Sequence, residues 1–160
     1  MDRTLTPAPL TAADFAPFGD VLALRDAPDK TINDGFCGRH HDLGRLDFGS
    51  GRAGISLFDA RPRSLPYRFD LLERHPEGSQ AFVPMHRTPW LVIVAPDEAG
   101  RPGMPQAFIA QGQGINLHRG TWHGVLTPLE DGLFAVVDRI GAGANLEEYR
   151  LDTAWTVVAT

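Results

Sequence analysis

Residues 112–127 read GQGINLHRGTWHGVLT, and this stretch is the most informative part of the sequence for predicting the fold. Its two apolar segments, residues 115–118 and 124–127, are short, contain β-branched side chains and read as strands. Two histidines, His118 and His123, flank the polar turn between them. The stretch therefore predicts a strand–turn–strand unit with a concentration of polar side chains that a core would not explain.

The rest of the chain has the same texture of short strands. Its 17 glycines and 13 prolines punctuate the 160 residues at fairly even intervals, which is typical of an all-β sandwich or barrel. Residues 90–95 are apolar on both faces and predict a central strand covered on both sides, whereas residues 96–105, half of them proline or glycine, predict a surface connection. Further strands are predicted at residues 20–24, 54–58, 67–73, 80–83, 106–110, 133–138 and 148–151.

One short helix is predicted near the N-terminus. Thr11 is a suitable N-cap for the sequence AADF that follows it, and Pro17 ends the helix after about one turn. The remaining sequence contains no sustained helical periodicity, so the predicted architecture is all-β with this single turn of helix.

Size and charge exclude several classes of protein. The 160 residues, 42% of them hydrophobic, predict a single soluble domain over residues 1–160. A net charge of −5 and scattered arginines argue against nucleic-acid binding. We expect no signal peptide and no membrane span, since residues 90–95 form the longest apolar run and a bilayer is about 30 Å thick. The single cysteine, Cys37, favours a reducing, cytoplasmic location.

A second polar segment lies at residues 72–84, LERHPEGSQAFVP. If the strand before it extends to His75, Glu73 and His75 point to one face and Arg74 to the other. Gln80 follows across a turn that contains proline and glycine. The segment therefore predicts that Glu73, His75 and Gln80 line one cavity together with His123 of residues 112–127.

This predicted group has two readings. It offers two oxygens and two imidazole nitrogens, a donor set acceptable to a divalent cation with open positions for water or substrate. The alternative is a pocket without a metal, in which the same side chains bind substrate directly. The predicted group consists of Glu73, His75, Gln80 and His123.

The two polar segments resemble the two sequence motifs of the cupin superfamily. The second motif fits well, because its spacing is kept by Gly112, His118, Gly120 and His123. His118 stands where the pattern has proline, and Thr127 stands where it has asparagine. The first motif is weaker, because a metal-binding cupin has His-x-His and then glutamate where this chain has ERH and then glutamine.

Four segments taken together resemble a narrower family, the ureidoglycolate lyases, also called ureidoglycolate hydrolases. These segments are INDGFCGRHHDL (32–43), LERHPEGSQAFVP (72–84), QGINLHRGTWHGVL (113–126) and VVDR (136–139), and the resemblance runs from FAPFGDV to NLEEYRL. It implies a cupin-like double-stranded β-helix, a jelly-roll barrel, that usually forms a homodimer. It also implies cleavage of (S)-ureidoglycolate into glyoxylate and urea in allantoin and purine degradation. The cofactor that the resemblance implies is a divalent metal ion, and nickel is one of the metals it suggests.

The implied reaction assigns roles to the polar side chains. Ureidoglycolate is a carbinolamide, and breaking its carbon–nitrogen bond needs a base for the hydroxyl proton and an acid for the departing urea. Glu73 or His123 is the candidate base. Whichever of His75 and His118 is not committed to a metal is the candidate acid.

The substrate carboxylate needs a fixed cation, and three arginines are candidates. Arg119 lies in the turn between the two histidines, whereas alternation puts Arg74 on the face opposite Glu73. Arg139 follows Asp138, and that order also fits a structural ion pair on the surface.

Two further residues are candidates for substrate binding. His41 belongs to the RHHDL sequence that matches the family, and Asn33 offers an amide to the urea group. Asn33 also begins the sequence Asn-Asp-Gly, which is equally typical of a turn.

Two other functions compete with the lyase. A non-catalytic cupin module that binds small acids would have lost its proton-transfer pairs, and the retained glutamate and histidines argue against it. A cupin oxygenase needs a facial site of two histidines and a carboxylate for iron, and Gln80 in place of the usual acid argues against that.

Overall fold

The computed structural model describes residues 3–160 and confirms the all-β class. One helical turn, α1 (Ala12–Phe15), accompanies the strands. The strands are β1 (Arg3–Leu5), β2 (Ala8–Pro9), β3 (Gly19–Leu22), β4 (Lys30–Ile32), β5 (Cys37–Arg39), β6 (Arg52–Ala60), β7 (Tyr67–Arg74), β8 (Gln80–Pro84), β9 (Pro89–Ala95), β10 (Asp97–Glu98), β11 (Arg101–Pro102), β12 (Gln106–Gln111), β13 (Gly114–Leu117), β14 (Trp122–His123), β15 (Thr127–Pro128), β16 (Gly132–Ile140) and β17 (Glu147–Val157).

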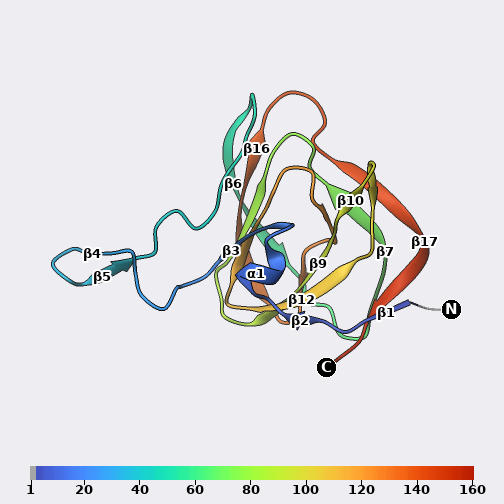
Figure 1. Ribbon diagram of the computed structural model, residues 1–160, viewed down its shortest axis with the longest axis horizontal. Helices are drawn as coiled ribbons and strands as arrows, with labels where there is room; N and C mark the ends of the chain where they lie inside the picture. The colour runs from blue at the N-terminus through green and yellow to red at the C-terminus, as the bar shows by residue number, and fades with distance from the viewer. Residues whose placement is uncertain (1–2) are drawn as a thin grey trace.

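Two curled sheets form the body of the molecule (Figure 1). The larger has the order β1-β17-β7-β14-β9-β12-β2, with β15 also paired to β9, and the smaller has the order β3-β13-β8-β16-β6. Two small hairpins, β4-β5 and β10-β11, complete the strands. Figure 1 shows the β4-β5 hairpin projecting away from the sheets as an arm.

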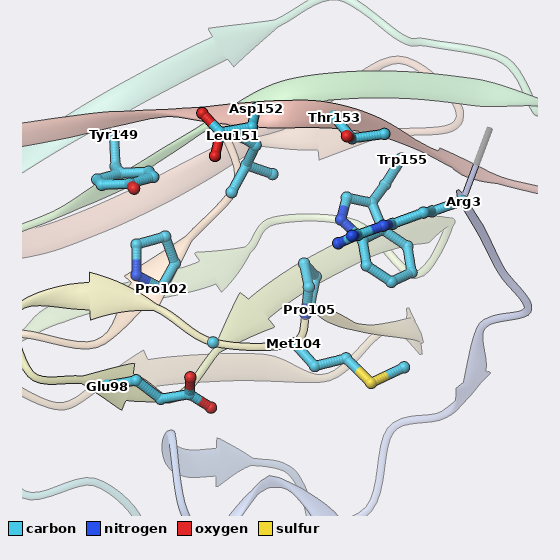
Figure 2. Close-up of a pocket in the computed structure, with 11 residues that line it drawn as sticks. Arg3, Glu98, Pro102, Met104, Pro105, Tyr149, Leu151, Asp152, Thr153 and Trp155 are labelled. Atoms are coloured by element: carbon cyan, nitrogen blue, oxygen red, sulfur yellow. The ribbon is translucent and has the colours of Figure 1, made fainter. Parts of the chain in front are cut away.

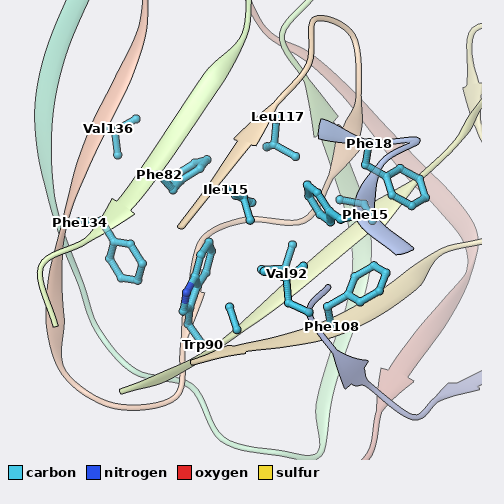
Figure 3. Close-up of a cluster of buried hydrophobic side chains, with 13 residues drawn as sticks. Phe15, Phe18, Phe82, Trp90, Val92, Phe108, Ile115, Leu117, Phe134 and Val136 are labelled. Atoms are coloured by element: carbon cyan, nitrogen blue, oxygen red, sulfur yellow. The ribbon is translucent and has the colours of Figure 1, made fainter. Parts of the chain in front are cut away.

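The main hydrophobic core lies between the two sheets (Figure 3). Trp90, Val92 and Val94 of β9 face it, together with Phe82 of β8 and Phe134 of β16. The intervening residues of β9 belong to a second buried cluster formed within the larger sheet. Because β9 is buried on both faces, the prediction of a central, doubly covered strand is confirmed.

The helical turn closes one side of the main core. The Thr11 side chain accepts a hydrogen bond from the backbone N–H of Asp14, which caps the turn. Phe15 and Phe18 are buried, and Phe15 packs edge-on against Phe108 with ring centroids 5.8 Å apart.

The predicted strand at residues 124–127 is wrong. β14 ends at His123 opposite Val94, and β15 begins at Thr127 opposite Leu91. Between these two pairs, the segment from His123 to Thr127 contains one residue more than the segment of β9 from Val94 to Leu91. The strand pairing is therefore interrupted, as it is at a β-bulge.

Two other boundaries differ from prediction. The predicted connection at residues 96–105 contains the β10-β11 hairpin, whose turn residues Ala99 and Gly100 both have positive φ, as a tight hairpin turn requires. β17 extends well beyond the predicted 148–151: its pairing with β7 is interrupted by a register shift between Arg150 and Trp155 and then resumes as far as Val157. Within residues 3–160, no helix has the length and apolar character that a membrane span requires.

Candidate active site

Glu73, His75 and His123 come together at one end of the space between the sheets. β14 pairs with β7 so that His123 lies opposite Glu73, and His75 directly follows β7. The imidazole centroids are 5.2 Å apart, and His123 Nδ1 lies 4.0 Å from Glu73 Oε1. One ligand atom from each of the three residues lies within 4.8 Å of the others. The structure thus brings together three of the four side chains that the sequence predicts in one cavity.

Hydrogen bonds fix the tautomers of both histidines. His75 Nδ1 lies 2.7 Å from the Asn145 carbonyl oxygen, and His123 Nδ1 lies 2.9 Å from the Gly124 carbonyl oxygen. A carbonyl oxygen only accepts, so each Nδ1 carries the proton and each Nε2 presents a lone pair. Both Nε2 atoms are buried, and neither has a hydrogen-bond partner among residues 3–160.

Burial sets the charge of the cluster. The pKa of His123 is lowered to about 4, chiefly by burial; the Gly124 carbonyl opposes this shift, and the neighbouring His75 adds to it. Burial also raises the pKa of Glu73 above its usual range; Glu148 adds to this, whereas His75 opposes it. His123 is therefore neutral near pH 7, and Glu73 is a stronger base than an exposed carboxylate.

The same arrangement fits a divalent metal. One nitrogen from each imidazole and one carboxylate oxygen lie within 4.8 Å of one another and could form a set of three protein ligands, with positions left for water or substrate. Histidine ligands of metals usually donate the other ring N–H to a carbonyl or carboxylate, as both of these histidines do. Imidazole with carboxylate suits zinc, iron and nickel alike, so the residues define a site and not the identity of an ion.

Gln80 faces the same interior as this cluster. It precedes Phe82 by two residues on β8, so both side chains point into the main core, where Phe82 and His123 line a small internal cavity. Its Nε2 donates to Asp138 Oδ2 at 3.2 Å, and its Oε1 is buried without a partner in the described part of the chain. Gln80 is 5% exposed.

Asp138 is an interior residue that the sequence analysis missed. It pairs with Gln80 in the register of β16 on β8, and it lies two residues after the buried Val136 on the same face. The suggested surface ion pair between Asp138 and Arg139 is wrong, because alternation sends the two side chains to opposite faces of β16. The signal in the sequence was the alternation of side chains within VVDR, which places Asp138 on the same face of the strand as Val136.

His118 lies outside the cluster. Its neighbour Leu117 is buried in the main core, and because side chains alternate along a strand, the His118 side chain points away from that core. His118 Nε2 lies 3.1 Å from Asp20 Oδ2, and its side chain is 44% exposed. Its predicted role in catalysis stays a prediction that this geometry does not favour.

Two of the three candidate arginines already bind carboxylates. Arg119 makes a two-bond contact with Asp47 at 2.8 and 2.9 Å. Arg74 binds Asp97 at 2.9 Å and Glu147 at 2.7 Å, and its guanidinium lies 4.4 Å from the centre of the Trp122 ring. Both side chains would have to leave these partners to bind a substrate carboxylate.

Arg139 is the candidate arginine without a carboxylate partner among residues 3–160. Its Nη2 donates to the Ala142 carbonyl, and its Nε is buried without a partner. Glycines from three segments surround the side chain: a Cβ would lie 2.6 Å from its Cγ at Gly51, 3.1 Å from its Cβ at Gly78 and 2.6 Å from its Nη2 at Gly141. The space for this guanidinium therefore depends on these glycines.

The last two candidates, Asn33 and His41, belong to the exposed arm. Asn33 opens the turn of the β4-β5 hairpin with a φ of 56°, so the turn interpretation of its sequence is confirmed. The backbone N–H of His41 donates to Asp29, and the side chains of Asn33 and His41 are exposed. The structure does not bring either residue into the Glu73 cluster.

A separate groove of about 570 Å³ runs along β17 (Figure 2). Figure 2 shows Glu98 and Met104 on one side and Tyr149 and Trp155 on the other. None of the predicted site residues lines it.

The fold and the cluster together describe an all-β protein of two curled sheets, with a carboxylate and two histidines that could hold a metal ion close together between them. A family model described as ureidoglycolate lyase matches residues 2–158. The chain is 60% identical over 146 residues to a ureidoglycolate lyase of Rhodobacter capsulatus, covering 89% of this chain and 91% of the relative. It is 49% identical to a ureidoglycolate lyase of Chelativorans sp., covering 92% of each chain, and 46% identical to ureidoglycolate lyase 2 of Rhizobium meliloti, covering 93% of this chain and 94% of the relative. The chain belongs to the ureidoglycolate lyase family, as its four motifs predicted.

Proposed function

We propose that this protein is a ureidoglycolate lyase that splits (S)-ureidoglycolate into glyoxylate and urea. The observation that carries the proposal is the 60% identity to the Rhodobacter capsulatus lyase over most of both chains. The cluster of Glu73, His75 and His123 supports it, because it places a carboxylate of raised pKa beside two imidazoles. We place this site in a cupin-type double-stranded β-helix that forms a single domain over residues 1–160.

Glu73 is the proposed base. It takes the proton of the carbinol hydroxyl, the O–H electron pair forms the carbonyl of glyoxylate, and the carbon–nitrogen pair leaves with the urea nitrogen. The Nδ1 proton of each imidazole is held by a backbone carbonyl, so neither histidine has a proton free for the leaving group. The proton that the departing urea requires therefore returns from Glu73, and no water is consumed.

Glu73, His75 and His123 would hold the divalent metal, nickel included, that the family resemblance implies. A bound divalent ion supplies Lewis-acid chemistry by lowering the pKa of a ligated hydroxyl. Glu73 needs only one oxygen as a ligand, which leaves the other for the proton. The geometry assigns none of the three candidate arginines to the substrate carboxylate, because Arg74 and Arg119 are already neutralised and Arg139 points to the face of β16 opposite Asp138.

Product analysis tests the reaction. The purified protein with (S)-ureidoglycolate should release urea and glyoxylate in equal amounts and no ammonia, because proton transfers around the carbinol carbon leave the ureido carbonyl intact. Urea and ammonia are measured separately by coupled assays. Stoichiometric ammonia would contradict the lyase, since it requires water attack on the ureido carbonyl, which generally needs a more complete metal site.

The control addresses the spontaneous decay of ureidoglycolate to the same urea. The reaction must be faster with protein than without it, and one enantiomer must be consumed in preference to the other. No acceleration by folded protein would instead favour the non-catalytic binding module.

We also propose that the protein is a homodimer. The outer face of the smaller sheet exposes Ile55 and Leu57 of β6 and Val83 of β8 by 76%, 63% and 41%. β6 is the edge strand of this sheet, and its antiparallel pairing with a second copy about Ser56 would place Ile55 of each chain opposite Leu57 of the other. Such pairing would cover an exposed apolar edge that soluble proteins usually protect.

A charged residue in this face tests the dimer. Leu57→Glu should convert the protein to a species with the mass of one chain, 17.5 kDa, in analytical ultracentrifugation, because a buried unpaired carboxylate opposes association. Leu24→Glu is the matched control, since Leu24 is 79% exposed and follows β3, the strand at the opposite edge of the sheet. A dimer that survives Leu57→Glu would place the interface elsewhere.

A further inference from the structure

The interior holds a polar pair that the proposed proton transfer does not use. Gln80 and Asp138 lie opposite each other on β8 and β16, with Gln80 Nε2 donating to Asp138 Oδ2 at 3.2 Å. Gln80 Oε1 is buried and has no partner, and Asp138 forms no ion pair within residues 3–160. A buried acceptor without a donor is costly, so Gln80 Oε1 is available to a hydrogen-bond donor from outside the chain.

Asp138 fixes which way the Gln80 amide points. A carboxylate only accepts hydrogen bonds, so the NH₂ end of the amide turns toward Asp138 and the oxygen turns away from it. The pair thereby offers a ligand two acceptors, the amide oxygen of Gln80 and the carboxylate of Asp138. A ligand group that matches this surface must carry several N–H donors and no negative charge.

The pair lies at the same end of the interior as the Glu73 cluster. Only residues 76–79 separate His75 from Gln80, and Gln80 lies opposite Leu117 in the register of β13 on β8. Three residues beyond Leu117, the backbone N–H of Gly120 donates to the His75 carbonyl. These connections bring the start of β8 and the end of β7 to a common edge.

We infer that Gln80 and Asp138 form the subsite that recognises the ureido group of the substrate, with Gln80 Oε1 as the acceptor and Asp138 as its positioning residue. The inference rests on the proposed function and assigns an orientation to the substrate. The ureido group, –NH–CO–NH₂, carries three N–H bonds and no charge, whereas the carboxylate end would be repelled by Asp138. The ureido end therefore lies toward β8 and β16, and the carboxylate end lies away from them.

This subsite also explains how the site would reject other small acids. A site built around buried acceptors discriminates strongly against an analogue that lacks the matching donors, because the acceptors are then left unpaired. Pyruvate has a carboxylate and an adjacent carbonyl but a methyl group where the substrate has its ureido nitrogen. Oxalurate has the carboxylate, the carbonyl and the complete ureido group, and its carbonyl carbon cannot undergo the lyase reaction.

Calorimetric titration of the purified protein with oxalurate and with pyruvate tests the inference without relying on turnover. Asp138→Asn should weaken oxalurate binding by at least about tenfold and leave pyruvate binding unchanged, because it removes the negative charge and replaces one of the two acceptor oxygens with an NH₂ donor, so the Gln80 amide is no longer held in one orientation. Gln80→Met, which removes the acceptor and keeps a similar volume, should show the same selective loss. Asp59→Asn is the matched control, since Asp59 is exposed on the neighbouring strand β6.

Three results would overturn the inference. Oxalurate affinity could be unchanged in both variants, or both ligands could weaken equally in folded protein, which would indicate a structural role alone. A loss of bound metal on Gln80→Met, measured by elemental analysis after dialysis, would make Gln80 a metal ligand instead. The selective loss of oxalurate binding supports the subsite even if product analysis rejects the lyase, so the two proposals fail independently.

Discussion

Glu73→Gln is expected to lower kcat at least about a hundredfold, the usual scale for loss of a general base, while the protein remains folded. The substitution keeps the shape of the side chain and removes its basicity. Burial raises the pKa of the Glu73 carboxyl, so the native residue takes a proton more readily than an exposed carboxylate and still ionises. The amide has no such capacity, and steady-state kinetics with (S)-ureidoglycolate measures the loss.

Glu130→Gln is the matched control for this experiment, because Glu130 is exposed and carries no proposed role. The native protein and both variants should have the same circular dichroism spectrum, and each should unfold cooperatively on heating. If folded Glu73→Gln retained activity, Glu73 would be removed from the mechanism. The base would then have to be sought at His123, whose neutral form also presents a lone pair.

The acidic limb of the rate profile should depend on the same residue. Protonation of Glu73 removes the base, so kcat/KM should fall with decreasing pH at a value above that of an ordinary glutamate.

The positions of Glu73, His75 and Gln80 were predictable because they depend on local alternation and on one short turn. A strand that ends at residue 74 and a turn of a few residues leave little freedom for where Gln80 lies. The approach of His123 was predictable only through the motif, since its pairing with Glu73 joins residues far apart in the chain. Motif spacing supplied the long-range register that periodicity alone does not contain.

Which of the candidate arginines are paired with carboxylates was not predictable either, because these pairs also join residues that are far apart in the sequence. Arg119 is neutralised by Asp47, and Arg74 is neutralised by Asp97 and Glu147, at separations of 72, 23 and 73 residues. Nothing local to Arg139 distinguishes it from them. Only the three-dimensional pairing shows that it is the arginine whose charge is not matched by a carboxylate, and only the structure brings its three glycines around it.

The fold itself was predictable in class and in most strands, but not where a strand deviates from a regular ladder. The break between β14 and β15 and the long shift in β17 each depend on how a neighbouring strand is positioned. The sequence of residues 124–127 is compatible with a regular strand, and the extra residue relative to β9 becomes visible only when the two are paired.

The second large expected effect is on stability in acid, and His123 is its source. The pKa of His123 is about 4 in the folded protein, against an ordinary value of 6.5. Between these values the unfolded chain binds a proton that the folded protein does not bind, so lowering the pH favours unfolding. The stabilising contribution of neutral His123 is therefore fully present above about pH 6.5 and declines as the pH falls toward 4, by about 3 kcal/mol in all. Glu73 acts with the opposite sign, because its raised pKa makes the folded protein bind a proton before the unfolded chain does.

Replacing His123 with phenylalanine separates the two contributions, because it keeps a buried ring and removes the titrating group. In denaturant titrations of chelator-treated protein at a series of pH values, the native protein should lose about 3 kcal/mol more unfolding free energy between pH 7 and pH 4 than His123→Phe does. Glu73 contributes to both proteins and cancels in the comparison, since its pKa is displaced by burial, His75 and Glu148 and not by His123. Parallel pH profiles for the two proteins would show that His123 takes up its proton in the folded state as readily as in the unfolded chain. That result would contradict the neutral, lone-pair-bearing imidazole on which both the metal site and the return of the proton from Glu73 depend.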